Sequence, residues 1–132
     1  MTTLAGLLIG RCGLSQREAA DVLKVSINTV KSWMAGRAMP RPGVIDELRA
    51  LYAAIKRAAG EALAAIAAAP AADVIELGVA TDDHEAQGLG WPCVGAQAAM
   101  LGLVVARCGR PVRVVPRGST SATAASAEQH GG

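Results

Sequence analysis

The spacing of apolar residues at the start of the chain predicts a short helix over residues 4–11. Leu4, Leu7 and Leu8 recur at the i, i+3, i+4 interval of one helical face, so we expect these leucines to be buried. The two threonines that precede them can supply an N-terminal cap, and Gly13 is placed to end the helix.

Two further helices are expected directly afterwards, joined by a tight turn. Ser15 and Glu18 have the spacing of a capping box, which predicts a helix from Ser15 to about Leu23. Ser26 is placed to cap a third helix, and Gly36 has the position of the glycine that commonly follows a helix end. The few residues between Leu23 and Ser26 allow only a sharp corner.

A loop marked by prolines and glycine at 37–43 separates these helices from a long amphipathic stretch. Apolar residues recur with helical spacing from Val44 to about Ala69, which predicts either one long helix or two shorter ones. Gly60 is the position where such a helix would break or kink, and Pro70 ends it.

The second half of the chain has strand and helix patterns in turn. Residues 73–79 alternate well enough for a strand, and 80–90 have the composition of a polar loop. Residues 91–109 predict a buried helix with Pro92 in its first turn, and 111–115 predict a short closing strand.

Together these elements predict a mostly α fold with a small α/β unit. The expected divisions are a helical domain of four or five helices at 1–60, a helical connector at 61–72, a strand-helix-strand unit at 73–116 and a tail at 117–132. The tail is rich in Ser, Thr, Ala and Gly, a composition that predicts disorder.

Composition gives a reason to expect self-association. Apolar residues make up 52% of the chain but aromatic residues only 2%, so Ala, Leu and Val must fill a thin core. The helix core at 94–106 is apolar on nearly all sides, and two short strands cannot cover it. We therefore expect the second half to form a two-fold homodimer. The residues expected at that interface are Trp91, Met100, Leu101, Val104, Val105, Val112 and Val114.

Charge is distributed unevenly along the chain, although the net charge is only +2. Residues 1–60 contain nine Lys and Arg against four Asp and Glu, whereas residues 61–132 contain four against seven. A basic first half predicts a polyanionic partner for that half alone.

Two helices joined by a tight turn are the plan of a helix-turn-helix, whose second helix enters the major groove of DNA. The apolar residues expected to pack the pair together are Ala20, Leu23, Val25, Val30 and Trp33. The face that remains on the second helix consists of Ile27, Asn28, Lys31 and Ser32. Short polar side chains near a helix N-terminus are suited to reach base edges, so this face predicts a DNA-reading surface.

Each residue of that face has an expected role. Asn28 is expected to pair with adenine, Ile27 to meet a thymine methyl group and Ser32 to read either kind of base edge. Lys31 and Arg37 are placed for phosphate contacts, and the N-terminus of the preceding helix offers free N–H groups to another phosphate. The full set of expected DNA contacts is Gln16, Arg17, Ser26, Ile27, Asn28, Thr29, Lys31, Ser32 and Arg37.

Residues 4–59 resemble the Cro/cI-type (XRE-like) helix-turn-helix family of phage and bacterial regulators. The residues that carry the resemblance are Leu14, Gln16, Ala20, Leu23, Val25, Ser26, Thr29, Val30, Trp33, Gly36 and Pro40. The resemblance implies base contacts by Ile27, Asn28 and Ser32, with Gln16 as a phosphate anchor.

Two positions depart from that family pattern. Lys24 stands where the family usually has a turn glycine, which implies a lysine near the left-handed region at a cost of about 1 kcal/mol. Met34 stands where an acidic residue is common, so an internal ion pair found in some members is missing.

The second half resembles the dimerisation domain of anti-CRISPR-associated repressors of phages and mobile elements. The resemblance is carried by Leu89-Gly90-Trp91, by the helix of small residues that follows and by the closing strand at 112–115. It implies an autorepressor that binds an inverted repeat in the promoter of a short operon. Some relatives also bind their own messenger RNA, so RNA stays open as a further partner.

The rest of the sequence contains no motif that predicts catalysis. The Asp-Asp-His-Glu run at 82–85 lies in an expected loop where neighbouring side chains do not converge on one ion, so we expect no metal. Cys12, Cys93 and Cys108 are odd in number and widely spaced, which predicts core thiols in a reducing cytosol. We expect no enzyme, no cofactor and no membrane partner, and a cytoplasmic location.

The sequence thus predicts a homodimeric, sequence-specific DNA-binding repressor that acts on an inverted repeat. Two alternatives remain open at this point. One is the antitoxin of a toxin–antitoxin pair, in which the second half binds a toxin. The other is a protein-interaction module that does not bind DNA.

Overall fold

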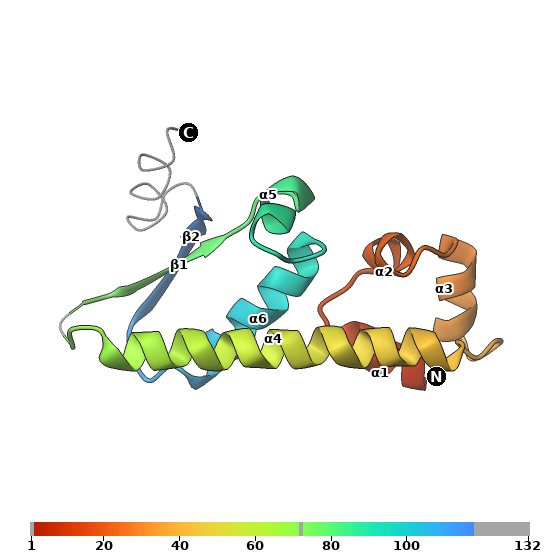
Figure 1. Cartoon of the computed structure of the whole chain (residues 1–132), viewed down its shortest axis with the longest axis horizontal. Helices are drawn as coiled ribbons and strands as arrows, with labels where there is room; N and C mark the ends of the chain where they lie inside the picture. The colour runs from red at the N-terminus through yellow and green to blue at the C-terminus, as the bar shows by residue number, and fades with distance from the viewer. Residues whose placement is uncertain (1, 72, 118–132) are drawn as a thin grey trace.

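The computed structural model describes residues 2–71 and 73–117, which form six helices and a two-stranded parallel sheet (Figure 1). The predicted mostly helical fold with a small α/β unit is confirmed. Nearly all of the predicted tail, together with His130, lies outside the described residues. None of the helices described here is both long enough and apolar enough to cross a membrane.

The first three helices are α1 (Leu4–Arg11), α2 (Gln16–Leu23) and α3 (Ile27–Met34), close to their predicted bounds. They begin where side chains cap them. The Thr3 hydroxyl accepts a hydrogen bond from the Gly6 N–H at 3.0 Å and starts α1. Each cap satisfies an N–H group that has no partner within the helix, which is why short helices form at these positions.

The expected buried face of α1 is wrong. Leu4 and Leu7 are 46% and 57% exposed, whereas Ala5 and Ile9 are buried and Leu8 lies partly buried against the core. The helix packs against α3 and α4, and this close packing places the small Ala5 at the contact. The leucine spacing therefore identified the helix but not the side on which it packs.

Helix α4 (Pro42–Ala68) runs without a break through Gly60, so the first of the two alternatives for this stretch is confirmed. Nothing lies within 4 Å of the place where a Gly60 side chain would be. The glycine therefore costs helix propensity, about 1 kcal/mol, without forcing a kink. The boundary expected at residue 60 falls inside this continuous helix.

The C-terminal unit consists of β1 (Ile75–Val79), α5 (Asp83–Gly88), α6 (Val94–Arg107) and β2 (Val112–Pro116). The two strands pair in parallel, and α6 forms the crossover between them. Helix α6 packs along α4, which covers it from the side that the strands leave open (Figure 1). The core of this unit contains Ala59, Leu77, Leu101 and Val104, with Ala62, Leu63 and Ile66 of α4 packed against it.

Two details of this unit differ from expectation. The stretch 80–90 contains the short helix α5, because Asp82 caps it by accepting a hydrogen bond from the Glu85 N–H at 2.8 Å. Helix α6 begins at Val94 with Cys93 as its N-cap, so Pro92 precedes the helix and does not lie in its first turn. Both differences arise at helix starts, which depend on capping geometry.

Two polar side chains fasten the C-terminal unit. Gln97 is buried in α6, where its amide accepts from the Ala80 N–H at 3.1 Å and donates to the Gly78 carbonyl at 3.0 Å. The Arg110 guanidinium donates to backbone carbonyls around the end of α4, and no carboxylate takes part in these bonds. The acceptors are Ile66 at 2.8 Å, Ala69 at 3.1 Å, Asp73 at 3.0 Å and Pro70.

Candidate nucleic-acid interface

Helix α3 presents a polar face to solvent while its apolar face is held in the core. Val30 and Trp33 are buried, as predicted, among side chains of α1, α2 and α4. Asn28 and Lys31 are exposed, and Ser32 is half-buried beside them. The predicted reading residues therefore lie on one accessible side of the helix.

Ile27 differs from the other residues of that face. It is half-buried and packs against the core of the helical domain, so only part of its side chain is available to a thymine methyl group. Thr29 is also half-buried. Its N–H donates to the Ser26 hydroxyl at 3.1 Å, and the two hydroxyl oxygens lie 2.9 Å apart. Ser26 and Thr29 thus shape the first turn of α3 before any contact with DNA.

The turn between α2 and α3 is made by a lysine in the left-handed conformation. Lys24 has φ 58° and ψ 46°, and it is the one non-glycine residue with positive φ in the part of the chain that the structure describes. Its N–H donates to the Ala20 carbonyl, and so does the N–H of Val25 at 3.0 Å. The left-handed conformation implied by the missing glycine is confirmed, and it allows these two hydrogen bonds to close the corner.

The N-terminus of α2 is the predicted phosphate contact. The capping box is formed in full: the Ser15 hydroxyl accepts from the Glu18 N–H at 3.1 Å, and the Glu18 carboxylate accepts from the Ser15 N–H at 2.9 Å. These bonds take up two of the amides at this end. Gln16 and Arg17 follow the cap with exposed side chains, which face solvent at the positive end of the helix.

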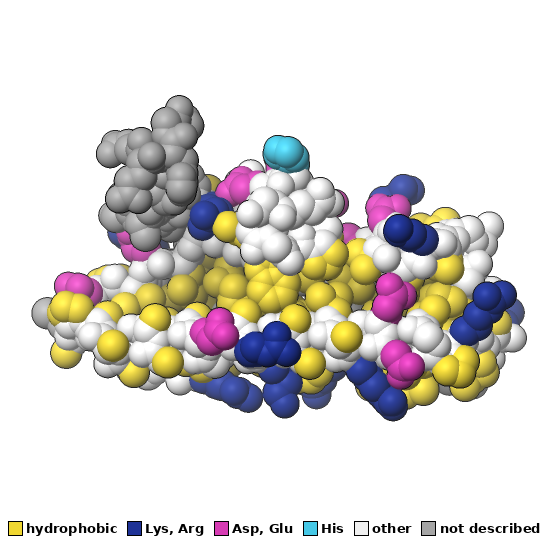
Figure 2. All heavy atoms as spheres, in the orientation of Figure 1, with side chains coloured by type: hydrophobic (Ala, Val, Ile, Leu, Met, Phe, Trp, Pro, Cys, Tyr) yellow, Lys and Arg dark blue, Asp and Glu magenta, His cyan; other side chains and the backbone are white. Residues whose placement is uncertain are grey.

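A groove of about 490 Å³ runs beside α3, between the turn and the start of α4. Two cations that were not among the expected contacts, Lys24 and Arg41, line it together with the exposed Met39. The other lining residues are Leu23, Val25, Thr29, Trp33 and Val44. Figure 2 shows Lys and Arg side chains at the end of the molecule formed by α2 and α3 and along the lower edge below α4. The excess of basic residues in 1–60 is the signal that points to these additional cations.

The residues expected at a dimer interface have different environments. Leu101 and Val104 are buried within the single chain, because α4 covers the face of α6 that was expected to need a partner. The half-buried members are Trp91, Met100 and Val112. Val105 and Val114 are 45% and 54% exposed. An accessible apolar surface thus remains at α6 and β2.

The cysteines lie apart from this polar face. Cys12 and Cys93 are buried, and burial raises the pKa of each thiol to about 11. Both are therefore protonated at neutral pH and weak as nucleophiles. Within residues 2–71 and 73–117, no three side chains of His, Cys, Asp or Glu are grouped in a way that could hold a metal ion.

Residues 7–63 match the family model of a helix-turn-helix domain. This part of the chain is a helix-turn-helix domain. The match begins inside α1 and ends inside α4, so it includes the whole α2–turn–α3 arrangement and supports a DNA-binding regulator. No curated protein and no solved structure matches the chain.

Proposed function

We propose that this protein is a sequence-specific transcriptional repressor that binds an inverted repeat as a homodimer. The observation that carries the proposal is the accessible polar face of α3, formed by Asn28, Lys31 and Ser32. The opposite face of the helix is held in the core by the buried Val30 and Trp33. A helix held in this way can enter a major groove without losing its packing.

The expected division of labour follows from side-chain chemistry. The Asn28 amide has a donor and an acceptor that match the adenine edge, and the Ser32 hydroxyl can serve as either. The positive charges of Lys31 and Arg37 suit phosphates on either side of the groove, and the start of α2 at Gln16 and Arg17 suits a third phosphate. The partly exposed Ile27 side chain is left to contact a thymine methyl group.

The dimer is proposed to form through the C-terminal unit. Val105 on α6 and Val114 on β2 leave apolar surface exposed in this unit. A second copy related by a two-fold axis would cover that surface. To read half-sites one helical turn apart, the dimer must hold its two copies of α3 about 34 Å apart.

Repression would follow if the inverted repeat lies in a promoter. The resemblance of the second half to anti-CRISPR-associated repressors favours autoregulation of a short phage or mobile-element operon, with its own messenger RNA as a further candidate partner. A reporter fused to the chain's own promoter tests this point, because co-expression of the protein should lower reporter output.

Selection of bound duplexes from a random pool tests the main proposal. We expect the wild-type protein to enrich a palindrome, and we expect Asn28→Ala and Ser32→Ala to change the preferred bases within each half. Gln87→Ala, which removes an exposed amide from α5, is the matched control and should leave the preference unchanged. The absence of any enriched sequence at low salt would refute DNA reading.

The exposed surface of the C-terminal unit also fits a second function, that of an antitoxin whose partner is a toxin. Purification distinguishes the two, because the repressor should be a stable homodimer when expressed alone. A chain that is soluble only with a co-expressed neighbour would favour the antitoxin.

A further inference from the structure

The first turn of α6 meets the segment between α1 and α2 at a contact made by two glycines. A Cβ atom on Gly95 would lie 2.3 Å from the Gly13 carbonyl oxygen. A Cβ atom on Gly13 would lie 2.4 Å from the Gly95 carbonyl oxygen and 2.8 Å from Cβ of Ala99. Gly13 also has a φ of +73°, which favours glycine. The two backbones can touch only because both residues lack a side chain.

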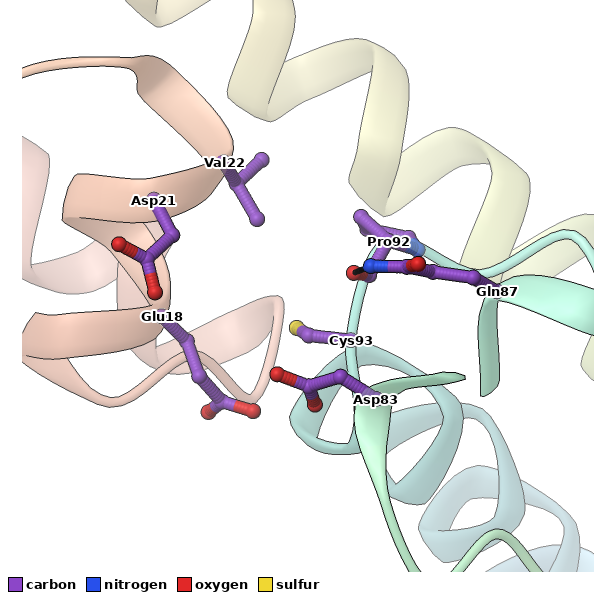
Figure 3. A pocket seen from close by; sticks show the side chains of 7 residues that line it. All are labelled: Glu18, Asp21, Val22, Asp83, Gln87, Pro92 and Cys93. Carbon is purple, nitrogen blue, oxygen red and sulfur yellow. Dashed lines mark hydrogen bonds between the residues drawn. The ribbon is translucent and has the colours of Figure 1, made fainter. Parts of the chain in front are cut away.

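A single carboxylate bridges the two helices beside this contact. One oxygen of Glu18, Oε1, accepts from the Ser15 N–H at 2.9 Å, while Oε2 accepts from the Gly95 N–H at 2.9 Å. Glu18 therefore caps α2 and binds the positive end of α6 at the same time. Figure 3 shows its carboxylate across from Cys93 and Asp83, whose side chains point from the C-terminal unit toward α2.

The α6 end of this contact is itself held in place. Asp83 Oδ1 accepts from the Val94 N–H at 3.0 Å, so each of the first two residues of α6 has a carboxylate partner, one from each side of the joint. Cys93 and Ala96 are buried in the core of the helical domain, whereas Leu101 and Val104 are buried in the second core. Helix α6 therefore spans both cores.

These contacts tie α6 to both parts of the molecule. Helix α4 passes through both parts of the molecule, α6 packs along α4, and the α6 N-terminus returns to α2 through Glu18 (Figure 1). Rotation of the C-terminal unit about α4 would separate Glu18 from the Gly95 N–H and the two glycine backbones from each other. The joint made by Gly13, Glu18 and Gly95 therefore resists such rotation, together with the packing of Cys93 and Ala96 in the core of the helical domain.

We infer that Glu18 is a positioning residue that fixes the angle between α3 and the C-terminal unit, and so sets the half-site spacing accepted by the dimer. The inference rests on the proposed function, because half-site spacing matters only for a dimer that carries two copies of α3. Glu18 is not among the residues proposed to read bases, and its two oxygens bind the Ser15 and Gly95 N–H groups. Glu18 affects DNA binding through the distance and the angle between the two copies of α3 in the dimer.

The test is a selection from duplexes that carry two copies of the preferred half-site at systematically varied separations. Wild-type protein should prefer a narrow range of separations. Glu18→Gln keeps the side-chain shape but leaves one acceptor oxygen for two N–H donors, so we expect a broader range and about tenfold weaker binding at the best separation. Preference for bases within a half-site should not change.

Asp21→Asn is the matched control, because Asp21 lies on the same helix and lines the same cavity of about 310 Å³ between α2 and the C-terminal unit. This variant should keep the narrow range of separations. Gly95→Ala is an independent second variant, since its new methyl group pushes α6 away from Gly13, and it should broaden the range as Glu18→Gln does.

The outcomes separate the inference from the proposed function. If wild-type protein enriches no duplex at all, the proposed function fails. If wild-type protein selects a palindrome and Glu18→Gln has an equally narrow range of separations, the inference is overturned while the proposed function stands. Circular dichroism of each variant shows that it is folded before its spacing preference is compared.

Discussion

The helix-turn-helix domain and the C-terminal unit are built in different ways. In the first, each short helix begins at its own cap. Ser15, Glu18 and Ser26 form these caps with residues only a few positions away in the sequence. In the second, the helix α6 is covered by α4, which belongs largely to the other domain, and its end is fastened by Glu18 from α2. The first region is specified locally, whereas the second depends on partners far along the chain.

The largest effect is expected in the core beneath the reading helix. Trp33→Ala should lower the free energy of unfolding by about 3–5 kcal/mol, because it leaves a cavity where α3 packs on the domain. Chemical denaturation measures the change. Met39→Ala is the control: its side chain is 79% exposed, and its effect should stay within about 0.5 kcal/mol. Equal effects would mean that α3 does not depend on this core.

The next effect tests how firmly the C-terminal unit is held by α4. Arg110→Ala removes the guanidinium that binds four carbonyls around the end of α4 and should destabilise the protein by about 2–3 kcal/mol. Arg113→Ala removes a surface ion pair with Glu76 and should cost less than about 1 kcal/mol. Similar losses for both variants would contradict the assigned role of Arg110.

A smaller effect of opposite sign is expected in the turn of the first region. Lys24→Gly should stabilise the protein by about 1 kcal/mol, because glycine adopts the left-handed conformation without strain. The same change at Lys56, in the middle of α4, should destabilise by about 1 kcal/mol. Thermal melting of the two variants gives the signs directly, and a destabilising Lys24→Gly would refute the strain.

The smallest effect concerns the joint between the two regions. Burial by itself raises the pKa of Glu18, but hydrogen bonds from the Ser15 and Gly95 backbone N–H groups and from the Cys93 and Ser15 side chains outweigh it and lower the pKa. Stability from this ionised carboxylate is fully present above the unfolded pKa of about 4.5 and is lost as the pH falls through the folded value.

Unfolding free energies of wild type and Glu18→Gln, measured between about pH 3 and about pH 7, test this linkage. The difference between them should shrink as the pH falls. A difference that is constant with pH would contradict the role of the Glu18 charge.

The sequence predicted the first region well because its determinants are short-range. The capping box at Ser15 and Glu18, the cap at Ser26 and the burial of Val30 and Trp33 all followed from residues a few positions apart. The side on which α1 packs did not follow, since helical spacing defines a stripe of leucines without saying which neighbour lies against it.

The second region was predicted less well for the same reason. The strands and α6 were found from periodicity, but α5 was missed because a polar helix of six residues has no apolar stripe. The second oxygen of Glu18 could not be assigned, since its partner Gly95 is 77 residues away. The cover that α4 gives to Leu101 and Val104 is likewise a long-range contact that no local pattern records.

Because α4 is unbroken, its length determines how the C-terminal unit is rotated relative to the helix-turn-helix domain. A helix of 27 residues is about 40 Å long, and each added residue turns everything beyond it by about 100°. Insertions near Gly60 would therefore rotate the C-terminal unit about the axis of α4 as well as move it along that axis. Because Glu18 and the Gly95 N–H tie α6 back to α2, an insertion that moves the C-terminal unit along or around α4 should break that joint.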